Sequence, residues 1–274
     1  RGPAASLYGA DAVGGVVQIF TRGDRALTVR VATGEWRSLQ LGVNAGLGDA
    51  ANGLSVTATQ SASRGFNAIV DPADFSYHPD RDGYRFNHAQ INAAVSPTDS
   101  LQLAFSAFET RGRAQYDGGP GYDDRLQSVV NAIRVSADMK LSSGWQSNLR
   151  IGSTRDQSNF DSAYPGRYRT ALDQLAWQNN VRLTPALNAL AAVEWRRESV
   201  SSTDLLPVTT RHTTSALLGG DWTQDALRLN ASARLDHSDQ YGDRGTANVG
   251  AGYRLGAGWR VLANGGNSFK APTF

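Results

Sequence analysis

Strict alternation of apolar and polar residues over ten consecutive positions is the feature that most limits how this chain folds. The stretch ALRLNASARLDH covers residues 226–237. Its odd-numbered positions from Leu227 to Leu235 are apolar, and its even-numbered positions from Arg228 to Asp236 are polar. Successive side chains of a strand point to opposite faces, so this pattern predicts a strand with one apolar and one polar face. The segment is also longer than the strands that are usual in globular proteins.

Similar segments recur along the whole chain. We expect thirteen strands, near residues 26–34, 37–46, 53–63, 84–95, 100–111, 127–141, 144–157, 168–184, 187–200, 211–223, 226–237, 246–255 and 258–270. Several of them are long enough for a tilted strand to cross a bilayer. The longest apolar run, ALNALAAV at 186–193, is far shorter than the roughly 18 residues that a membrane helix needs. A helical membrane protein is therefore excluded.

Short and long connections alternate between the expected strands. The short turns lie at 46–53, 96–100, 141–145, 183–187, 223–226 and 255–259. The long polar loops lie at about 63–84, 111–127, 157–168, 200–211 and 237–246. Short periplasmic turns and long outer loops are typical of bacterial outer-membrane barrels, so the sequence predicts an all-β fold, an antiparallel transmembrane β-barrel. A soluble β-rich protein is the alternative, and it predicts that the apolar faces meet in a core.

The composition argues against several classes of function. The net charge is only +2, from 27 Lys and Arg against 25 Asp and Glu, so no overall field favours nucleic acid. The chain has no cysteine, which excludes disulfides and thiolate catalysis. Its four histidines share no metal-binding spacing. We expect neither an enzyme nor a nucleic-acid partner, although an outer-membrane barrel enzyme stays open as an alternative.

The opening residues 1–23, RGPAASLYGADAVGGVVQIFTRG, resemble the last segment of the plug domain in TonB-dependent outer-membrane receptors. The matching positions are Arg1-Gly2-Pro3, Tyr8-Gly9, Ala12, Gly14-Gly15-Val16, Ile19 and Thr21, while Gln18 replaces the usual Asn. The resemblance implies that residues 1–23 end a plug domain and that residues 24–274 are the N-terminal part of a barrel, with about 13 of 22 strands.

The same resemblance implies an internal fragment of a longer receptor. Such a receptor lies in the bacterial outer membrane, in contact with outer-membrane lipid. It is driven by a TonB-type energy-transducing complex, through an N-terminal part that this chain does not include.

Within the family, the chain looks nearest to cobalamin receptors. The segments that carry this likeness are DRDGYRF at 80–86, QYDGG at 115–119, WQNN at 177–180, YGDRGT at 241–246 and NSFKAPTF at 267–274. The resemblance implies a transport receptor that takes up cobalamin. Siderophore receptors share some of these segments, so a ferric siderophore is the alternative ligand.

Carboxylates gather in the first two long loops. Asp71, Asp74, Asp80 and Asp82 lie in one loop, and Asp117, Asp123 and Asp124 lie in the other. Both loops should emerge on the same side, one hairpin apart, and clusters of oxygen ligands suit calcium. Aspartates in polar outer loops are also commonly just solvated, so that interpretation stays open.

The resemblance assigns roles to residues of these loops. In cobalamin receptors, aspartates of the two loops bind calcium ions that order the loops over the substrate. By position, the calcium ligands are Asp80, Asp82, Asp117, the backbone carbonyl of Tyr116, and either Asp123 or Asp124, with Asn67 where the family has another Asp. Gly118 and Thr170 are the expected cobalamin contacts. No redox or organic cofactor is expected.

Overall fold

The computed structural model describes residues 26–119, 121–256, 258–271 and 274. In these residues the chain forms thirteen strands and one short 3₁₀ helix, η1 (Glu35–Arg37). The strands are β1 (Thr28–Gly34), β2 (Ser38–Gly48), β3 (Gly53–Ser63), β4 (Tyr84–Thr98), β5 (Leu101–Tyr116), β6 (Asp124–Ser142), β7 (Trp145–Asp161), β8 (Gly166–Arg182), β9 (Leu187–Ser202), β10 (Thr210–Gln224), β11 (Leu227–Ser238), β12 (Gly242–Gly256) and β13 (Trp259–Gly266). Each expected segment overlaps one of these strands, which confirms the all-β prediction.

Two further expectations from the sequence concern the plug domain and membrane helices. The expected end of a plug domain, residues 1–23, lies outside the described residues. In the part that the structure describes, no helix has the length and apolar character needed to span a membrane.

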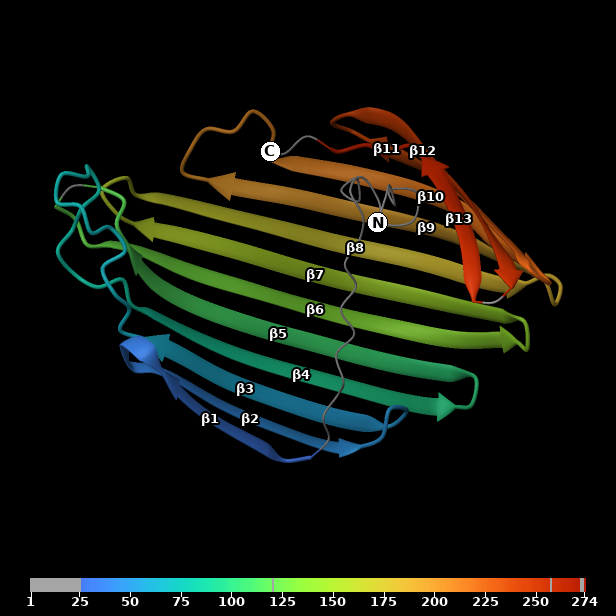
Figure 1. Ribbon diagram of the computed structural model, residues 1–274, viewed down its shortest axis with the longest axis horizontal. Helices are drawn as coiled ribbons and strands as arrows, with labels where there is room; N and C mark the ends of the chain where they lie inside the picture. Colours follow the sequence, from blue (N-terminus) through green and yellow to red (C-terminus); the bar gives the residue numbers. More distant parts are fainter. Residues whose placement is uncertain (1–25, 120, 257, 272–273) are drawn as a thin grey trace.

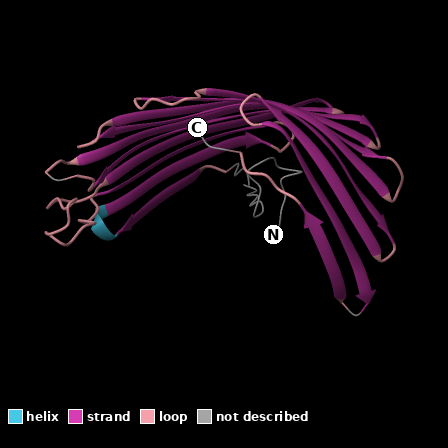
Figure 2. Cartoon of the chain, turned by 90° about the horizontal axis from the view of Figure 1, so that it is seen from above, coloured by secondary structure: helices cyan, strands magenta, loops and turns pink. Residues whose placement is uncertain are grey.

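The strands form one antiparallel sheet in which each strand pairs with its neighbours in the sequence, in the order β1 to β13 (Figure 1). Seen from above, the sheet bends into an arch (Figure 2). Within the described residues, β1 and β13 are the two edges and do not pair with each other. The sheet is therefore an open section of a barrel wall, in agreement with the partial barrel that we predict from the sequence.

One face of the sheet is apolar. A row that runs from partner to partner across seven strands consists of Leu54, Ala93, Phe105, Val135, Ile151, Leu175 and Trp195. The large side chains of this row are exposed, Ile151 to 54%. In the described part of the chain, the buried hydrophobic residues are only Leu217 and Ala271. The apolar faces do not meet in a core, so the soluble alternative is wrong, and we call this exposed apolar surface the apolar belt.

The opposite face is polar and lies on the concave side of the arch. Arg211 belongs to this face, and its guanidinium carbon lies 4.9 Å from the ring centre of Phe274, at the chain end that Figure 2 shows beneath the arch. Arg234 is 5% exposed and pairs with Glu194 at 2.7 Å and with Asp236 at 2.8 Å. Desolvated charges need such partners. The apolar belt is therefore on the convex side.

The hairpins close at two opposite ends of the sheet. The short-turn end carries 49–52, 99–100, 143–144, 183–186 and 225–226, and the loop end carries 64–83, 117–123, 162–165, 203–209 and 239–241. The expected strict alternation of short and long connections is wrong at the loop end for 162–165 and 239–241. Strands continue further there than expected, because polar residues such as Asn159 and Arg167 still pair across the ladder.

Candidate functional site

Two loops from neighbouring hairpins meet at the loop end of the sheet. Residues 64–83 join β3 to β4, and residues 117–123 join β5 to β6. Because β4 and β5 are paired strands, the two loops start side by side. Carboxylate oxygens of Asp80, Asp82 and Asp117 all lie within 4.8 Å of one another there. We call these three residues the carboxylate cluster, and they are three of the residues that the sequence assigned to one site.

The electrostatics of the carboxylate cluster favour a cation. Burial raises the pKa of Asp117, and the charges of Asp82 and then Asp80 raise this pKa further. Oδ2 of Asp117 and Oδ1 of Asp80 are buried without a hydrogen-bond partner in the described part of the chain. Nδ1 of His78 lies 3.2 Å from the same Asp80 oxygen. Mutually repelling oxygens with free lone pairs fit calcium, which takes about six to eight oxygen ligands.

The backbone of the first loop holds Asp82 in place. Oδ2 of Asp82 accepts the Ala68 N–H at 2.9 Å, and the Asp82 N–H donates to the Phe66 carbonyl at 3.0 Å. Gly65 precedes this contact with a φ of +65°, and a Cβ there would lie 1.8 Å from the Asp82 carbonyl oxygen. Only glycine fits this close approach in the left-handed region.

Asn67 and Asp123 lie near the carboxylate cluster but bond to other groups. The Asn67 side chain donates to the His78 carbonyl at 3.1 Å and accepts the Ile69 N–H at 3.2 Å, so it orders its own loop. Asp123 forms an ion pair with Arg125. Burial acts to raise the pKa of Asp123, but its hydrogen bonds from a glutamine and from Arg125 outweigh burial and lower the pKa.

Asp124 has a different position from the one expected of a metal ligand. It is only 1% exposed, and its Oδ2 accepts the Gly118 N–H while its Oδ1 accepts the Ala163 N–H, both at 2.8 Å. It therefore ties residues 117–123 to residues 162–165, and we call this arrangement the Asp124 clamp. Nothing in the local sequence predicts it, because Ala163 is far away along the chain.

Tyr116 and Gly118 are placed by the same clamp. Tyr116 ends β5 directly opposite Asp124. A Cβ on Gly118 would lie 2.8 Å from the Tyr116 ring and 3.1 Å from Oδ2 of Asp124, so the loop backbone passes close to both side chains. Gly118 therefore has a structural reason to be glycine, whether or not it touches a ligand.

The concave face beneath the loops carries aromatic side chains that the sequence analysis did not single out. Tyr84 and Phe86 have ring centres 5.6 Å apart, and Phe160 and Tyr168 have ring centres 6.0 Å apart. All four are at concave positions of the alternation, and so is Thr170, which is exposed on β8. Their even-numbered spacing near the strand ends was the signal that could have identified them.

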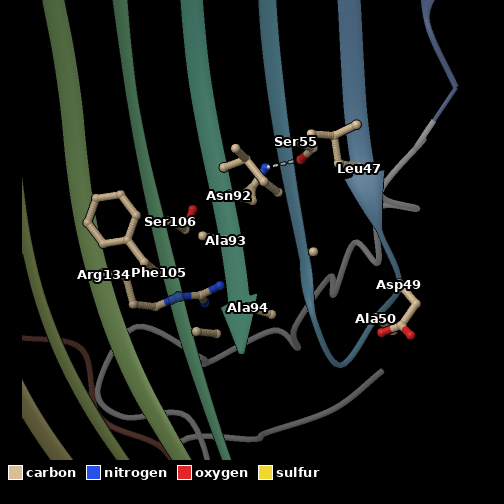
Figure 3. Close-up of a pocket in the computed structure, with 13 residues that line it drawn as sticks. Leu47, Asp49, Ala50, Ser55, Asn92, Ala93, Ala94, Phe105, Ser106 and Arg134 are labelled. Carbon is tan, nitrogen blue, oxygen red and sulfur yellow. Dashed lines mark hydrogen bonds between the residues drawn. The ribbon is translucent and has the colours of Figure 1, made fainter. Parts of the chain in front are cut away.

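Two cavities lie away from the carboxylate cluster. One of about 300 Å³ opens near the short-turn end, where Asn92 donates to Ser55 at 3.3 Å and Arg134 extends toward the same space (Figure 3). The other, of about 1050 Å³, is an apolar groove lined by residues of β9 to β13, among them Leu218, Leu229 and Ala231. This groove is a hollow in the apolar belt.

The family comparison covers nearly all of the chain. The family model described as "TonB dependent receptor-like, beta-barrel" matches residues 21–274. The vitamin B12 transporter BtuB of Photobacterium profundum is 30% identical over 288 residues, which cover 100% of this chain and 46% of that protein. The BtuB of Vibrio cholerae (serotype O1, strain M66-2) is 27% identical over 99% of this chain and 46% of that protein. The chain thus spans about half the length of these relatives.

Solved structures share the fold. The siderophore receptor PirA from Pseudomonas aeruginosa aligns with a TM-score of 0.76 at 19% identity, over 100% of this chain and 49% of that one. The ferric yersiniabactin receptor FyuA from Yersinia pestis aligns with a TM-score of 0.76 at 18% identity, over 96% and 50%. The family consists of receptors and transporters, not of enzymes. The chain belongs to the TonB-dependent receptors, whose β-barrels lie in the bacterial outer membrane.

Proposed function

We propose that the full-length protein takes up cobalamin across the outer membrane, with calcium ordering the loops that receive it. The carboxylate cluster is the observation that carries this proposal, because three carboxylates converge at the loop end and two of them, Asp80 and Asp117, each have a buried oxygen without a hydrogen-bond partner among the described residues. Similarity to vitamin B12 transporters over the whole chain supports the same ligand.

Calcium would be held by this chain's own loop residues. Asp80, Asp82 and Asp117 would supply carboxylate oxygens. The backbone carbonyl of Tyr116, the residue directly before Asp117 at the end of β5, would supply a further oxygen. A bound calcium ion would supply positive charge that offsets the repulsion among the three carboxylates. Because the residues come from two loops, the ion would fix residues 64–83 against residues 117–123.

The ligand surface would be the concave face just below these loops. Flat aromatic faces suit a large ring system, and the exposed Tyr84 also offers a hydroxyl group. Gly118 and Thr170, the expected cobalamin contacts, would belong to this ligand surface. Transport would depend on a TonB-type energy-transducing complex that acts on the full-length protein. A ferric siderophore is the competing ligand class, and it does not require the carboxylate cluster to hold a cation.

The test is cobalamin binding to the full-length protein in detergent, with millimolar calcium or with a chelator. We expect calcium to strengthen binding in the wild type but not in the triple variant D80A/D82A/D117A. The control is D71N/D74N, because these exposed aspartates of the same loop only cap local turns, at 2.9 and 2.8 Å from the Ala73 and Ser76 N–H groups.

Each outcome has a separate meaning. Calcium-dependent cobalamin binding that the triple variant loses and the control keeps supports both ligand and metal. If cobalamin binds equally with and without calcium, and equally to the wild type and the triple variant, the proposed calcium site is refuted. Failure to bind cobalamin, together with binding of a ferric siderophore, refutes the ligand and leaves the receptor family unchanged.

A further inference from the structure

A second charged surface lies on the convex face, above the apolar belt at the loop end. Its members are exposed arginines on five strands of the stretch β4 to β9, and we call them the arginine band: Arg85, Arg111, Arg113, Arg155, Arg167, Arg169 and Arg197. The register shows that they share the face of the belt. Arg85 is six residues beyond Ile91 on β4, and Arg197 is two residues beyond Trp195 on β9, in each case on the same side of the alternation.

The arginine band has little negative charge to balance it. Arg111 pairs with Glu109 at 2.7 Å. Among the described residues, no ion pair is formed by Arg85, Arg113, Arg155, Arg169 or Arg197. Two further carboxylates on this part of the face, Asp161 and Asp173, accept hydrogen bonds from neutral hydroxyl groups. The surface therefore has a net positive charge.

The pairing of strands places two arginines of the band directly beside each other, where an anion from outside the protein can bind both. Arg85 lies directly opposite Arg113 in the β4–β5 register. Like charges in directly opposed positions destabilise a sheet. An anion that binds both guanidinium groups removes this repulsion, and a phosphate accepts bidentate hydrogen bonds from arginine.

The depth of the band fits the headgroup region of a bilayer. Its arginines lie from two to eight residues beyond the last large apolar side chain on the same face of their strand, as Arg155 lies four beyond Ile151. At about 3.3 Å per residue this is about 7–26 Å along the strand. Strands tilted by about 40° rise only about 5–20 Å over that length. Headgroups begin directly beyond the hydrocarbon that covers the apolar belt, and long arginine side chains can reach back toward them.

We propose that the arginine band binds phosphate-bearing headgroups of lipids in the leaflet on the loop side. The charge of the band complements these headgroups, and the band lies on the same face of the sheet as the apolar belt. The lipid chains cover the belt while the phosphates bridge arginines of adjacent strands, foremost Arg85 and Arg113. The band thereby fixes how deep the barrel wall sits in the membrane. The proposal concerns the convex face and is independent of the ligand that the concave face receives.

The experiment measures lipid retention by the full-length protein in detergent micelles that contain phosphatidic acid or zwitterionic phosphatidylcholine. Native mass spectrometry counts the lipids that stay bound. The test variant is R85Q/R113Q/R155Q/R169Q. The control is R30Q/R134Q/R150Q/R260Q, which removes the same charge from exposed arginines on the concave face.

We expect the wild type and the control to retain phosphatidic acid in preference to phosphatidylcholine, and the test variant to lose about tenfold or more of that preference. The double variant R85Q/R113Q should already lose part of it and should not unfold, since it removes a repulsion. Equal retention by test variant and control overturns the proposal. The proposal is also overturned if inorganic phosphate in lipid-free micelles occupies the band as fully as phosphatidic acid does, because the band would then be a site for a free anion.

Discussion

The Asp124 clamp allows a quantitative prediction about how the loops are held together. Replacing Asp124 with Ala removes both acceptors and leaves the Gly118 and Ala163 N–H groups without their partner. Hydrogen bonds to a charged group contribute about 1.5–3 kcal/mol each, so the two together stabilise the closed loops by about 3–6 kcal/mol. Since about 1.4 kcal/mol is a factor of ten, the open state of these loops gains at least about a hundredfold in population.

Hydrogen exchange of the full-length protein measures this population directly. We expect peptides that contain residues 117–123 and 162–165 to lose about a hundredfold or more of their protection in D124A, within the limits of the wild-type protection. The turn at 49–52 should not change. Asp124→Asn keeps one acceptor and should lie between D124A and the wild type.

A matched control separates the clamp from a general loss of charge in the loop. Asp123→Ala removes a carboxylate from the adjacent position, but this carboxylate bonds to Arg125 and Gln115 and not to the second loop. We expect D123A to leave residues 162–165 protected. If D124A changes neither loop, or if D123A opens residues 162–165 equally, the clamp does not couple the loops and our reasoning is wrong.

Three further predictions test other parts of the structure. Burial, followed by two neighbouring carboxylates, raises the pKa of Asp117, so its protonated form stabilises the metal-free loops. This stabilisation is complete below the ordinary pKa of 3.8 and is lost as pH rises through the raised pKa. In the presence of a chelator, the loops should therefore resist protease better at the lower pH. Calcium should bind better at the higher pH. Thr213 is 1% exposed and its Oγ1 has no partner in the described residues, so T213V should leave thermal stability unchanged or raise it, whereas S215A should lower stability by about 1–3 kcal/mol because Ser215 bonds to Asp236. Gly118→Ala should displace the loop, because its Cβ would lie 2.8 Å from the Tyr116 ring, and we expect calcium affinity to fall about tenfold.

Strand positions could be predicted because the alternation is a local property. The expected segment 226–237 became Leu227–Ser238, and 53–63 became Gly53–Ser63, because the side-chain period of two residues is visible within each segment. The ends were less accurate where polar residues continue the ladder. The segment expected at 168–184 begins at Gly166, where polar strand partners replace the contrast that marks a lipid-facing strand.

The carboxylate cluster could be predicted in part for a similar reason. Asp80, Asp82 and Asp117 flank the ends of adjacent strands, so adjacency along the chain places them together once a hairpin is assumed. The role of Asp124 could not be predicted, since it depends on a contact with Ala163 in the next hairpin. A carboxylate that binds backbone N–H groups has the same sequence signature as one that binds a metal.

The arginine band needed knowledge of a different kind. Each arginine alone is one more polar residue near the end of a strand, and the sequence gives no reason to group Arg85 with Arg113. Only the register places them opposite each other, and a shift of one residue in that pairing would turn one of them toward the concave face. Two opposite charges are therefore separated at one end of the sheet. Arginines on the strands face the lipid, while the aspartates follow after the strands end and gather in the loops. The proposed calcium site in the loops and the proposed phosphate site on the convex face therefore have opposite charges, and each can be tested without disturbing the other.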